Sequence, residues 1–338
     1  MSACPNVLVL TVAGAGAGLG HVKRCAALGS ALARVGASIR FAVAGDAERL
    51  GPLGTTLPGF EALQWLGSPR LALEIAERSG AELIVVDAYR ATDELLRALR
   101  TRGAVVAAID DLADRELPVD VVVNGAYGAG RRGYADVSGR RLLLGPRFAL
   151  LEPGFADLPR RAVRPLVSRV LVTLGGEDAG DVVAAALAAV GRAAPGAVIE
   201  LALGHFARSA AAGNASVRLH QGLVSLRALL LEADFAVTGA GMTLYECLAA
   251  GTPAVVLPVA DNQKPNFDEL TGAGMALPGQ PDLAAAVERL SRDAALREAL
   301  AERGRALVDG RGAARVAAEL IAAVAQAAPS AGPVRGAG

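Results

Sequence analysis

Residues 7–32 decide the fold, and they read VLVLTVAGAGAGLGHVKRCAALGSAL. An unbroken apolar run opens the stretch, a glycine-rich turn follows, and an apolar pattern with helical spacing begins near Val22. An apolar run of this length without polar alternation predicts a strand that is buried on both faces. The glycines let the backbone turn sharply from the strand into the helix. The stretch therefore predicts one strand–turn–helix unit of a parallel sheet.

The same unit recurs along the chain. Further apolar runs, most of them followed by helical segments, are ASIRFAVA, AELIVVDAY with TDELLRALR, AVVAAIDD, VDVVVN, AVIELALG, SVRLHQ, FAVTGAGMTLYECLAAG and AVVLPVADNQ. The pattern lapses over the proline-rich residues 142–168, resumes at 169–190, and ends with one helix expected over 283–308. A lapse of this kind is typical of a domain linker. We predict an α/β protein with two Rossmann-like parallel-sheet domains, residues 1–157 and 158–325, and a flexible tail at 326–338.

The overall composition favours a small-molecule enzyme or binding protein. The 34 basic side chains balance the 34 acidic ones, so no nucleic acid or anionic membrane is expected as a partner. No apolar run approaches the length of a membrane-spanning helix, and the first residues carry no charged leader. The three cysteines are odd in number and lack CxxC spacing, which predicts a reducing, cytoplasmic location. The sequence does not determine the oligomeric state.

The first glycine-rich turn is a candidate ligand site. Its glycines are Gly14, Gly16, Gly18 and Gly20. They do not fit the GxGxxG fingerprint of dinucleotide-binding proteins in any register. The turn ends in His21, Lys23 and Arg24, just beyond the carboxyl end of the first predicted strand, where open α/β sheets bind their ligands. The alternative is a simple turn in which the histidine only caps the next helix.

Two similar turns follow strands in the second predicted domain. They contain Gly175, Gly176, Glu177 and Asp178 in one case, and Gly239, Gly241, Met242 and Thr243 in the other. Glycines let a ligand approach the backbone, and the free N–H groups at a helix N-terminus favour a phosphate. Glu246 lies one turn into the second helix, and Asn262 and Gln263 follow the next strand. Together they predict a diphosphate site, although each turn alone is also ordinary loop chemistry.

These motifs, in this order, resemble a known family. The matching segments are GLGHVKRC (18–25), VVDAY (85–89), IDDLADR (109–115), VVVNGAYGAG (121–130), LLGPRFALLEPGF (143–155), LVTLGGED (171–178), GAGMTLYECLAAGTP (239–253) and DNQ (261–263). They look like the UDP-sugar hydrolases of pseudaminic acid biosynthesis, within the larger GT-B group of nucleotide-sugar enzymes. The resemblance extends from about residue 7 to about residue 290. It implies the GT-B fold, with a cleft between the two domains.

The resemblance also implies roles for individual residues. His21 would be the general base that activates water, and Tyr89 would line the sugar pocket beside it. The substrate-binding residues would be Gly18, Gly20, Lys23, Arg24, Asn124, Tyr127, Gly175, Gly176, Glu177, Asp178, Gly239, Gly241, Met242, Thr243, Glu246, Asn262 and Gln263. Among these, the GAGMT turn would bind the diphosphate and Glu246 the ribose. The implied reaction is hydrolysis of a UDP-sugar with inversion, with no cofactor.

The chemistry of the residues agrees with a single base. A nucleoside diphosphate is a good leaving group, so the reaction does not require the second carboxylic acid of glycosidases. A histidine is suited to taking a proton from water at neutral pH. No metal site is expected, since His21, His205 and His220 do not pair at ligand spacing.

Two alternatives to hydrolysis are an inverting glycosyltransferase with a soluble acceptor and a non-catalytic nucleotide-sugar binding protein. The sequence departs from the hydrolases in two places, at GGED (175–178) and at EPG (152–154) after Leu151. These differences affect the expected substrate more than the expected fold. Asp87, Asp110 and Asp111 are candidate catalytic acids, although acids that end a buried strand more often cap a turn. His205 and His220 are expected to be structural or on the surface.

Overall fold

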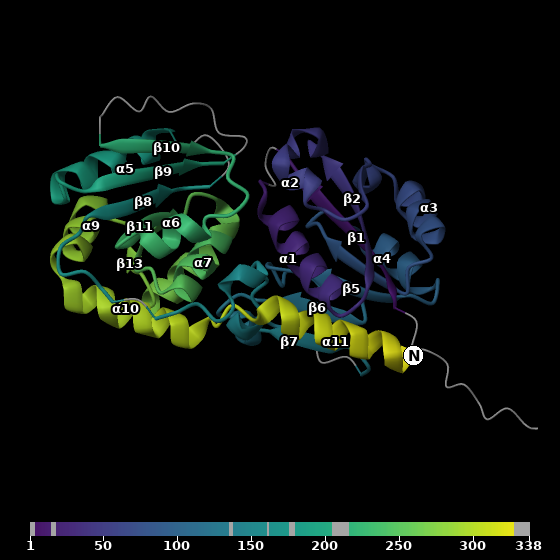
Figure 1. Cartoon of the computed structure of the whole chain (residues 1–338). Helices are drawn as coiled ribbons and strands as arrows, with labels where there is room; N and C mark the ends of the chain where they lie inside the picture. Colours follow the sequence, from purple (N-terminus) through teal and green to yellow (C-terminus); the bar gives the residue numbers. More distant parts are fainter. Residues whose placement is uncertain are drawn as a thin grey trace, which may run out of the picture.

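The computed structural model describes residues 4–14, 18–134, 138–160, 162–175, 180–204 and 216–327. Two α/β domains lie side by side, each built on a parallel sheet (Figure 1). The predicted fold class is therefore confirmed. The pairings between strands in both sheets are parallel, as expected for strands joined through helices.

The first domain contains a seven-stranded sheet in the order β3-β2-β1-β4-β5-β6-β7. Its strands are β1 (Asn6–Ala13), β2 (Ser38–Gly45), β3 (Phe60–Ala62), β4 (Leu83–Asp87), β5 (Val105–Ile109), β6 (Val121–Asn124) and β7 (Arg141–Leu144). Its helices are α1 (Gly20–Arg34), α2 (Pro52–Thr55), α3 (Pro69–Ser79) and α4 (Asp93–Arg100). Residues of β1 are almost completely buried because α1 covers one face of the sheet and α3 and α4 cover the other.

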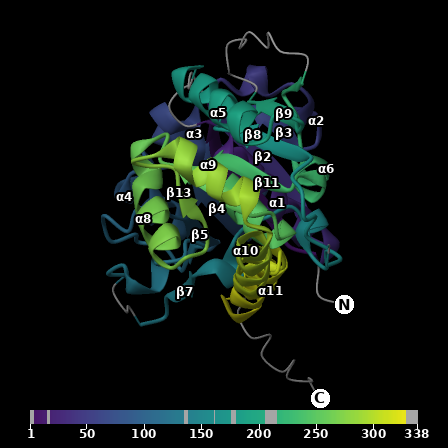
Figure 2. The ribbon, with the colours of Figure 1, turned by 90° about the vertical axis from the view of Figure 1, so that its left-hand side faces the viewer.

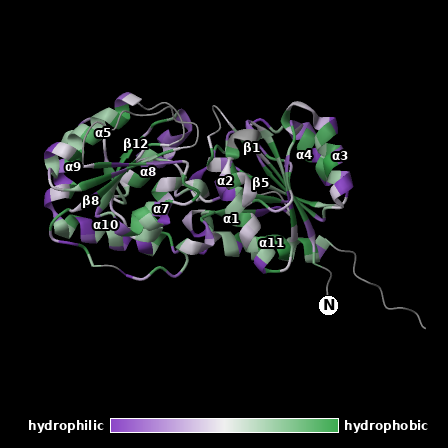
Figure 3. Ribbon diagram, turned by 45° about the horizontal axis from the view of Figure 1, so that its top comes forward, coloured by the Kyte–Doolittle hydropathy of each residue, from purple (hydrophilic) through white to green (hydrophobic). Residues whose placement is uncertain are grey.

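The second domain contains a six-stranded sheet in the order β10-β9-β8-β11-β12-β13. Its strands are β8 (Arg169–Thr173), β9 (Val198–Leu203), β10 (Val217–Gln221), β11 (Phe235–Gly239), β12 (Ala254–Leu257) and β13 (Leu277–Pro278). The helices after β8 are α5 (Gly180–Ala193), α6 (Arg227–Glu232), α7 (Met242–Ala250), α8 (Lys264–Gly272), α9 (Leu283–Arg292), α10 (Ala294–Leu307) and α11 (Gly312–Ala327). In both domains apolar strands lie inside a shell of helices with polar outer faces (Figure 3).

The single helix expected over 283–308 is two helices. Asp293 ends α9 and caps α10, because its carboxylate accepts a hydrogen bond from the backbone N–H of Leu296 at 2.8 Å. An aspartate at this position satisfies a free N–H group of a new helix and so favours a break. The apolar spacing continues across the break, which is why it predicted one helix.

The last helix does not pack with the domain to which the sequence assigned it. Figures 1 and 2 show α11 following α10 and passing beneath the first domain. Its buried residues are Ala313, Val316, Ala317, Leu320 and Ala323, and they belong to the same apolar cluster as α1 and β1. Conversely, Leu151 and Phe155 pack in the core of the second domain. The chain therefore crosses between the domains twice, and residues 158–325 do not form one continuous unit.

The two crossings are in close contact. A Cβ atom on Gly312 would lie 2.1 Å from the carbonyl oxygen of Ala149, and a Cβ atom on Gly310 would lie 2.1 Å from that of Phe155. Only glycine allows the backbone segments to approach this closely. The two passages of the chain are thus packed directly against each other.

We expect Leu320→Ala to destabilise the protein by about 2–5 kcal/mol, since Leu320 is fully buried against the first domain. Denaturant unfolding measures the change. The matched control is Leu166→Ala at an 82% exposed position, with an expected change within about 0.5 kcal/mol. Equal effects of the two substitutions would show that α11 does not stabilise the first domain.

Candidate functional site

A cleft of about 550 Å³ lies between the two domains, lined by residues from the carboxyl ends of both sheets. Most of the sequence-predicted site residues meet there: Gly18, Gly20, His21, Lys23, Arg24, Tyr89, Gly175, Gly239, Gly241, Met242, Thr243, Glu246, Asn262 and Gln263. Gly176, Glu177 and Asp178 lie outside the described residues. Asn124 and Tyr127 are not among the lining residues.

His21 is held at the start of α1 by a buried carboxylate from the neighbouring strand. Its Nδ1 lies 2.6 Å from Oδ1 of Asp87, the last residue of β4. Both side chains are almost inaccessible to solvent, although the histidine contributes to the cleft wall. An ionised carboxylate only accepts hydrogen bonds, so at this distance Nδ1 donates its proton to Asp87 and Nε2 is the ring nitrogen left to act on a substrate. The pair has the geometry of an oriented general base.

Arg24 keeps that carboxylate ionised. Its Nε and Nη2 donate to Oδ2 and Oδ1 of Asp87, both at 2.7 Å. Burial alone would raise the pKa of Asp87, but the charge of Arg24, with the contribution of His21, holds it well below its usual range. Nη2 of Arg24 also lies 3.1 Å from Nδ1 of His21. Since both nitrogens carry protons that point to Asp87, this contact follows from a shared acceptor and is not a further hydrogen bond.

A second chain of hydrogen bonds extends from Arg24 across the cleft. Nη1 of Arg24 and the hydroxyl of Tyr89 both donate to Oδ2 of Asp111 at 2.6 Å. The side-chain amide of Asn262, from the second domain, donates to the Tyr89 hydroxyl at 3.3 Å. The Tyr89 ring meets the imidazole of His21 edge to face, with centroids 4.6 Å apart. Burial and the nearby Asp111 carboxylate raise the pKa of Tyr89, so it remains a neutral hydrogen-bond donor.

Sequence reasoning weighed the three acidic residues together, and the structure separates them. Asp87 and Asp111 belong to the network around Arg24. Asp110 caps a turn instead, since its carboxylate accepts from the backbone N–H groups of Leu112 and Ala113. The alternative expectation, that these aspartates only cap turns, is therefore correct for Asp110 and not for Asp87 or Asp111.

The opposite wall of the cleft is formed by the turn before α7. The helix begins at Met242, and no side chain caps its N-terminus at Gly241. Oε1 of Gln263 accepts from the backbone N–H groups of Ala240 and Val259 at 3.0 and 3.3 Å. Gln263 thus fixes the shape of the turn, which leaves the first N–H groups of α7 available to a ligand.

Glu246 is the notable charged residue of this wall. Its Oε2 is buried without a hydrogen-bond partner in the described part of the chain. Burial raises the pKa of Glu246 to about 7, the positive charge of Lys23 opposes this, and Glu152 adds to it. A buried carboxylate oxygen without a partner is costly unless a ligand supplies a donor.

Asn124 and Tyr127, predicted to bind substrate, make contacts with the protein framework next to cleft residues Gly125 and Ala126. The buried Asn124 accepts from the backbone of Ala126 and donates to the hydroxyl of Tyr134. The backbone N–H of Tyr127 donates to the hydroxyl of Tyr245, which links the two domains. A polar side chain near a strand end can satisfy its own loop as easily as a ligand, and sequence does not distinguish the two.

The remaining cleft residues were not singled out from the sequence. Arg132 donates to the backbone oxygen of Asp111 and pairs with Glu269 of the second domain at 3.1 Å. Tyr245 and Asn266 are linked through their side chains at 3.0 Å. Arg132 and Tyr245 lie close to glycine-rich turns, but their contacts are to residues distant in the sequence or in the other domain, which no local pattern marks.

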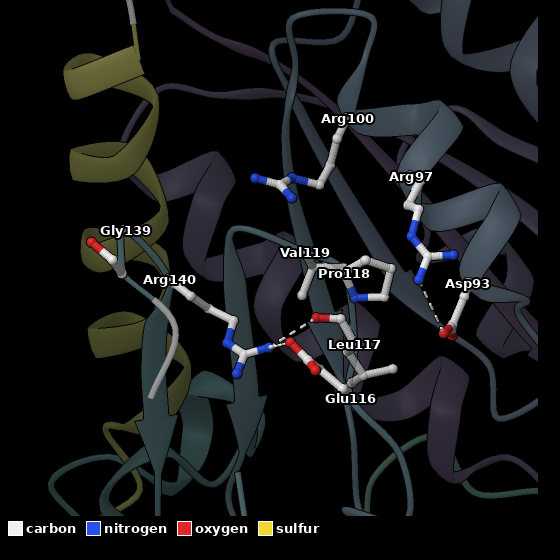
Figure 4. Close-up of a pocket in the computed structure, with 10 residues that line it drawn as sticks. Asp93, Arg97, Arg100, Glu116, Leu117, Pro118, Val119, Gly139 and Arg140 are labelled. Carbon is white, nitrogen blue, oxygen red and sulfur yellow. Dashed lines mark hydrogen bonds and ion pairs between the residues drawn. The ribbon is translucent and has the colours of Figure 1, made fainter. Parts of the chain in front are cut away.

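A second cavity, of about 510 Å³, lies between α4 and the segment leading to β7 (Figure 4). It shares no lining residue with the cleft. Arg97 faces Asp93 at 3.7 Å, and Arg140 donates to the carbonyl of Leu117. Its charges are therefore engaged with one another.

His220 lies away from the cleft, where its Nε2 pairs with Glu200 at 2.7 Å, consistent with a structural role. His205 lies outside the described residues. Across those residues, no group of three or more His, Cys, Asp or Glu side chains has an arrangement that fits a metal ion. Within the same part of the chain, each helix is too short or too polar to span a lipid bilayer.

Two parallel-sheet domains that face each other across such a cleft define the GT-B fold of glycosyltransferases. The solved structure of the glycosyltransferase SnogD from Streptomyces nogalater has a TM-score of 0.65 at 23% identity, covering 94% of this chain and 99% of SnogD. LpCGTa, solved in complex with UDP, has a TM-score of 0.65 at 16% identity, covering 96% of this chain and all of its own.

Among curated proteins, the chain is similar to the spore coat polysaccharide biosynthesis protein SpsG of Bacillus subtilis (strain 168). The two are 27% identical over 259 residues, which cover 71% of this chain and 76% of SpsG. No known protein-family profile matches the chain.

The buried carboxyl group of Glu246 makes the stability of the free protein depend on pH. Since its pKa is raised from 4.5 to about 7, the folded chain holds this proton more tightly than the unfolded chain. Stability therefore falls as the pH rises across this range. We expect Glu246→Gln to be more stable than wild type at pH 8 by about 1–3 kcal/mol and equal to it at about pH 4, below the ordinary pKa of the carboxyl group.

Denaturant unfolding at the two pH values measures this difference. Glu302→Gln, on the exposed side of α10, is the control and should change stability at neither pH. A wild type and a Glu246→Gln variant of equal stability at pH 8 would show that the carboxyl group is not buried as described.

Proposed function

We propose that the protein transfers a sugar from a nucleoside diphosphate sugar to a hydroxyl group, with inversion at the anomeric carbon. The observation that carries this proposal is the buried Asp87–His21 pair, which presents a base to a cleft of the GT-B type. The turn before α7, with its free N–H groups, faces the same cleft and suits a diphosphate.

The reaction follows from this arrangement. Nε2 of His21 takes the proton of the acceptor hydroxyl as its oxygen attacks the anomeric carbon. The bond from that carbon to the diphosphate breaks on the opposite face, and its electron pair leaves with the nucleotide. Asp87 stabilises the imidazolium that forms, as it already accepts the Nδ1 proton. The proton passes to solvent when the products leave.

Two likenesses support a nucleotide-sugar donor. LpCGTa was solved with UDP, and SpsG is described as a polysaccharide biosynthesis protein. Both accord with a role in carbohydrate biosynthesis, with UDP as the leading nucleotide to test. The Tyr89 ring packs against His21 and its hydroxyl donates to Asp111, which supports the proposal that both side chains contact the sugar.

Hydrolysis is the second candidate. The segments GLGHVKRC and VVVNGAYGAG resemble those of UDP-sugar hydrolases, and the same base would serve if water replaced the acceptor. The likeness to glycosyltransferase structures favours transfer to a hydroxyl acceptor over hydrolysis.

A panel of UDP-sugars and dTDP-sugars tests the proposal. Nucleotide release is measured in buffer alone and with a panel of monosaccharides and aliphatic alcohols, and proton NMR reports the anomeric configuration of the product. We expect release that depends on an acceptor and an inverted product. Equal release in buffer alone would favour hydrolysis, and a retained configuration would exclude His21 as the base in direct displacement.

The Asp87–His21 pair predicts the effect of two variants. His21→Ala should lower kcat by at least about 100-fold, since general base catalysis contributes on this scale, while UDP binding is retained. Asp87→Asn should also lower kcat, because it removes the charge that orients and stabilises the imidazole. His220→Ala, in the pair with Glu200 away from the cleft, is the control and should keep full activity.

A further inference from the structure

We infer that Lys23 is the cation that binds the diphosphate of the donor and stabilises the charge of the leaving nucleotide. The inference rests on the proposed function and names the residue that meets the diphosphate. In the reaction above, the electron pair of the broken bond arrives on a phosphate oxygen, which gains negative charge as the nucleotide leaves. A cation near that oxygen stabilises the transition state more than the ground state.

The position of Lys23 on α1 separates it from the base. His21 and Arg24 are three residues apart, so they share one face of the helix and both reach Asp87. Lys23 projects from a different side of the same turn and lines the cleft. Glu246 of α7 lines the same cleft, and the positive charge of Lys23 lowers the pKa of its carboxyl group.

Unlike Arg24 and Arg132, Lys23 has a charged group that is available to bind a ligand. Arg24 is held by Asp87 and Asp111, and Arg132 is held by Glu269 and by the backbone of Asp111. The ammonium of Lys23 makes no hydrogen bond or ion pair with the residues that the structure describes. A lysine ammonium with three free donors is well suited to phosphate oxygens.

The charge distribution of the cleft orients the donor. Around the base, the guanidinium of Arg24 is already paired with the carboxylates of Asp87 and Asp111, so it is not available to a diphosphate. At the other end, Lys23 and the N-terminus of α7 are both positive. The diphosphate therefore lies toward α7, and the sugar lies toward His21.

The unpartnered Oε2 of Glu246 supports the same placement. It is buried one turn into α7, beside the proposed diphosphate position, and it calls for a hydrogen-bond donor. A nucleoside diphosphate supplies a hydroxyl donor for Glu246 and a diphosphate for Lys23, because its ribose is bonded directly to the phosphates. Lys23 and Glu246 come from different domains and line the same cleft, so a ligand that meets both residues contacts both sides of the cleft.

Calorimetric titration of UDP, UMP and uridine into wild type and Lys23→Met tests the inference. We expect Lys23→Met to weaken UDP binding by about 10- to 100-fold, the range for a lost hydrogen bond to a charged group. Binding of UMP should weaken less, and binding of uridine should not change. Lys23→Arg should restore part of the affinity for UDP, because it retains the charge.

Lys264→Met is the matched control. Lys23 and Lys264 are the lysines of this arginine-rich chain, and Lys264 is 71% exposed and pairs with Asp268 in α8. Its removal should leave binding of all three ligands unchanged. Wild-type affinity for UDP should also fall with rising salt while that for uridine stays constant, a measurement that needs no variant.

The outcomes separate this inference from the proposed function. If wild type binds neither UDP nor dTDP, the proposed function fails. If wild type binds UDP and Lys23→Met binds it equally well, the inference about Lys23 is overturned and the proposed function stands. An equal loss for UDP and uridine also overturns it, since Lys23 would then only support the shape of the cleft. Insensitivity of wild-type UDP binding to salt would contradict it even if Lys23→Met did not fold.

Discussion

The site depends on a carboxylate buried at the end of a central strand. Asp87 has no exposed surface, yet it remains ionised because Arg24 donates two hydrogen bonds to it and His21 a third. A buried charge is costly unless it is fully paired, and here the pairing also orients the imidazole. Removing Arg24 would leave an uncompensated charge in the core of the first domain. The hydrogen bonds to Asp87 therefore serve both the stability of the first domain and the orientation of the proposed base, which restricts the substitutions that His21, Arg24 and Asp87 can tolerate.

The fold was largely predictable because its strands are buried on both faces. Apolar runs such as residues 7–12 must be buried on both faces, and a parallel sheet covered by helices on each side achieves this. The last helix was assigned to the wrong neighbour for a physical reason. The apolar spacing of an amphipathic helix predicts that one face is buried, but not which domain covers that face. In the structure α11 packs against α1 of the first domain, and no local sequence pattern predicts this return of the chain.

The same limit applies to the candidate site. Glycine turns at strand ends located most of the cleft, since parallel strands deliver their carboxyl ends to one edge. The role predicted for Asn124 stays a prediction, since its amide is hydrogen-bonded within its own loop in the free protein. Arg24 lines the cleft as expected of a substrate-binding residue, and its three nitrogens are hydrogen-bonded to Asp87 and Asp111, two residues more than 60 positions away. Long-range pairing of this kind decides which cations remain available, and sequence spacing does not report it. The assignment to UDP-sugar hydrolases stays a prediction, and the structural likenesses agree with it at the level of the GT-B fold.

The double crossing of the chain also bears on how the protein is made. The apolar face of the first domain that α11 covers is composed of residues synthesised near the beginning, whereas α11 spans residues 312–327. During synthesis the first sheet can form long before its last covering helix leaves the ribosome. Until then, the surface around α1 stays open to water and to other nascent chains. The second domain is, in this sense, inserted between the first domain and its covering helix, so completion of the first core waits until residues 312–327 have been synthesised.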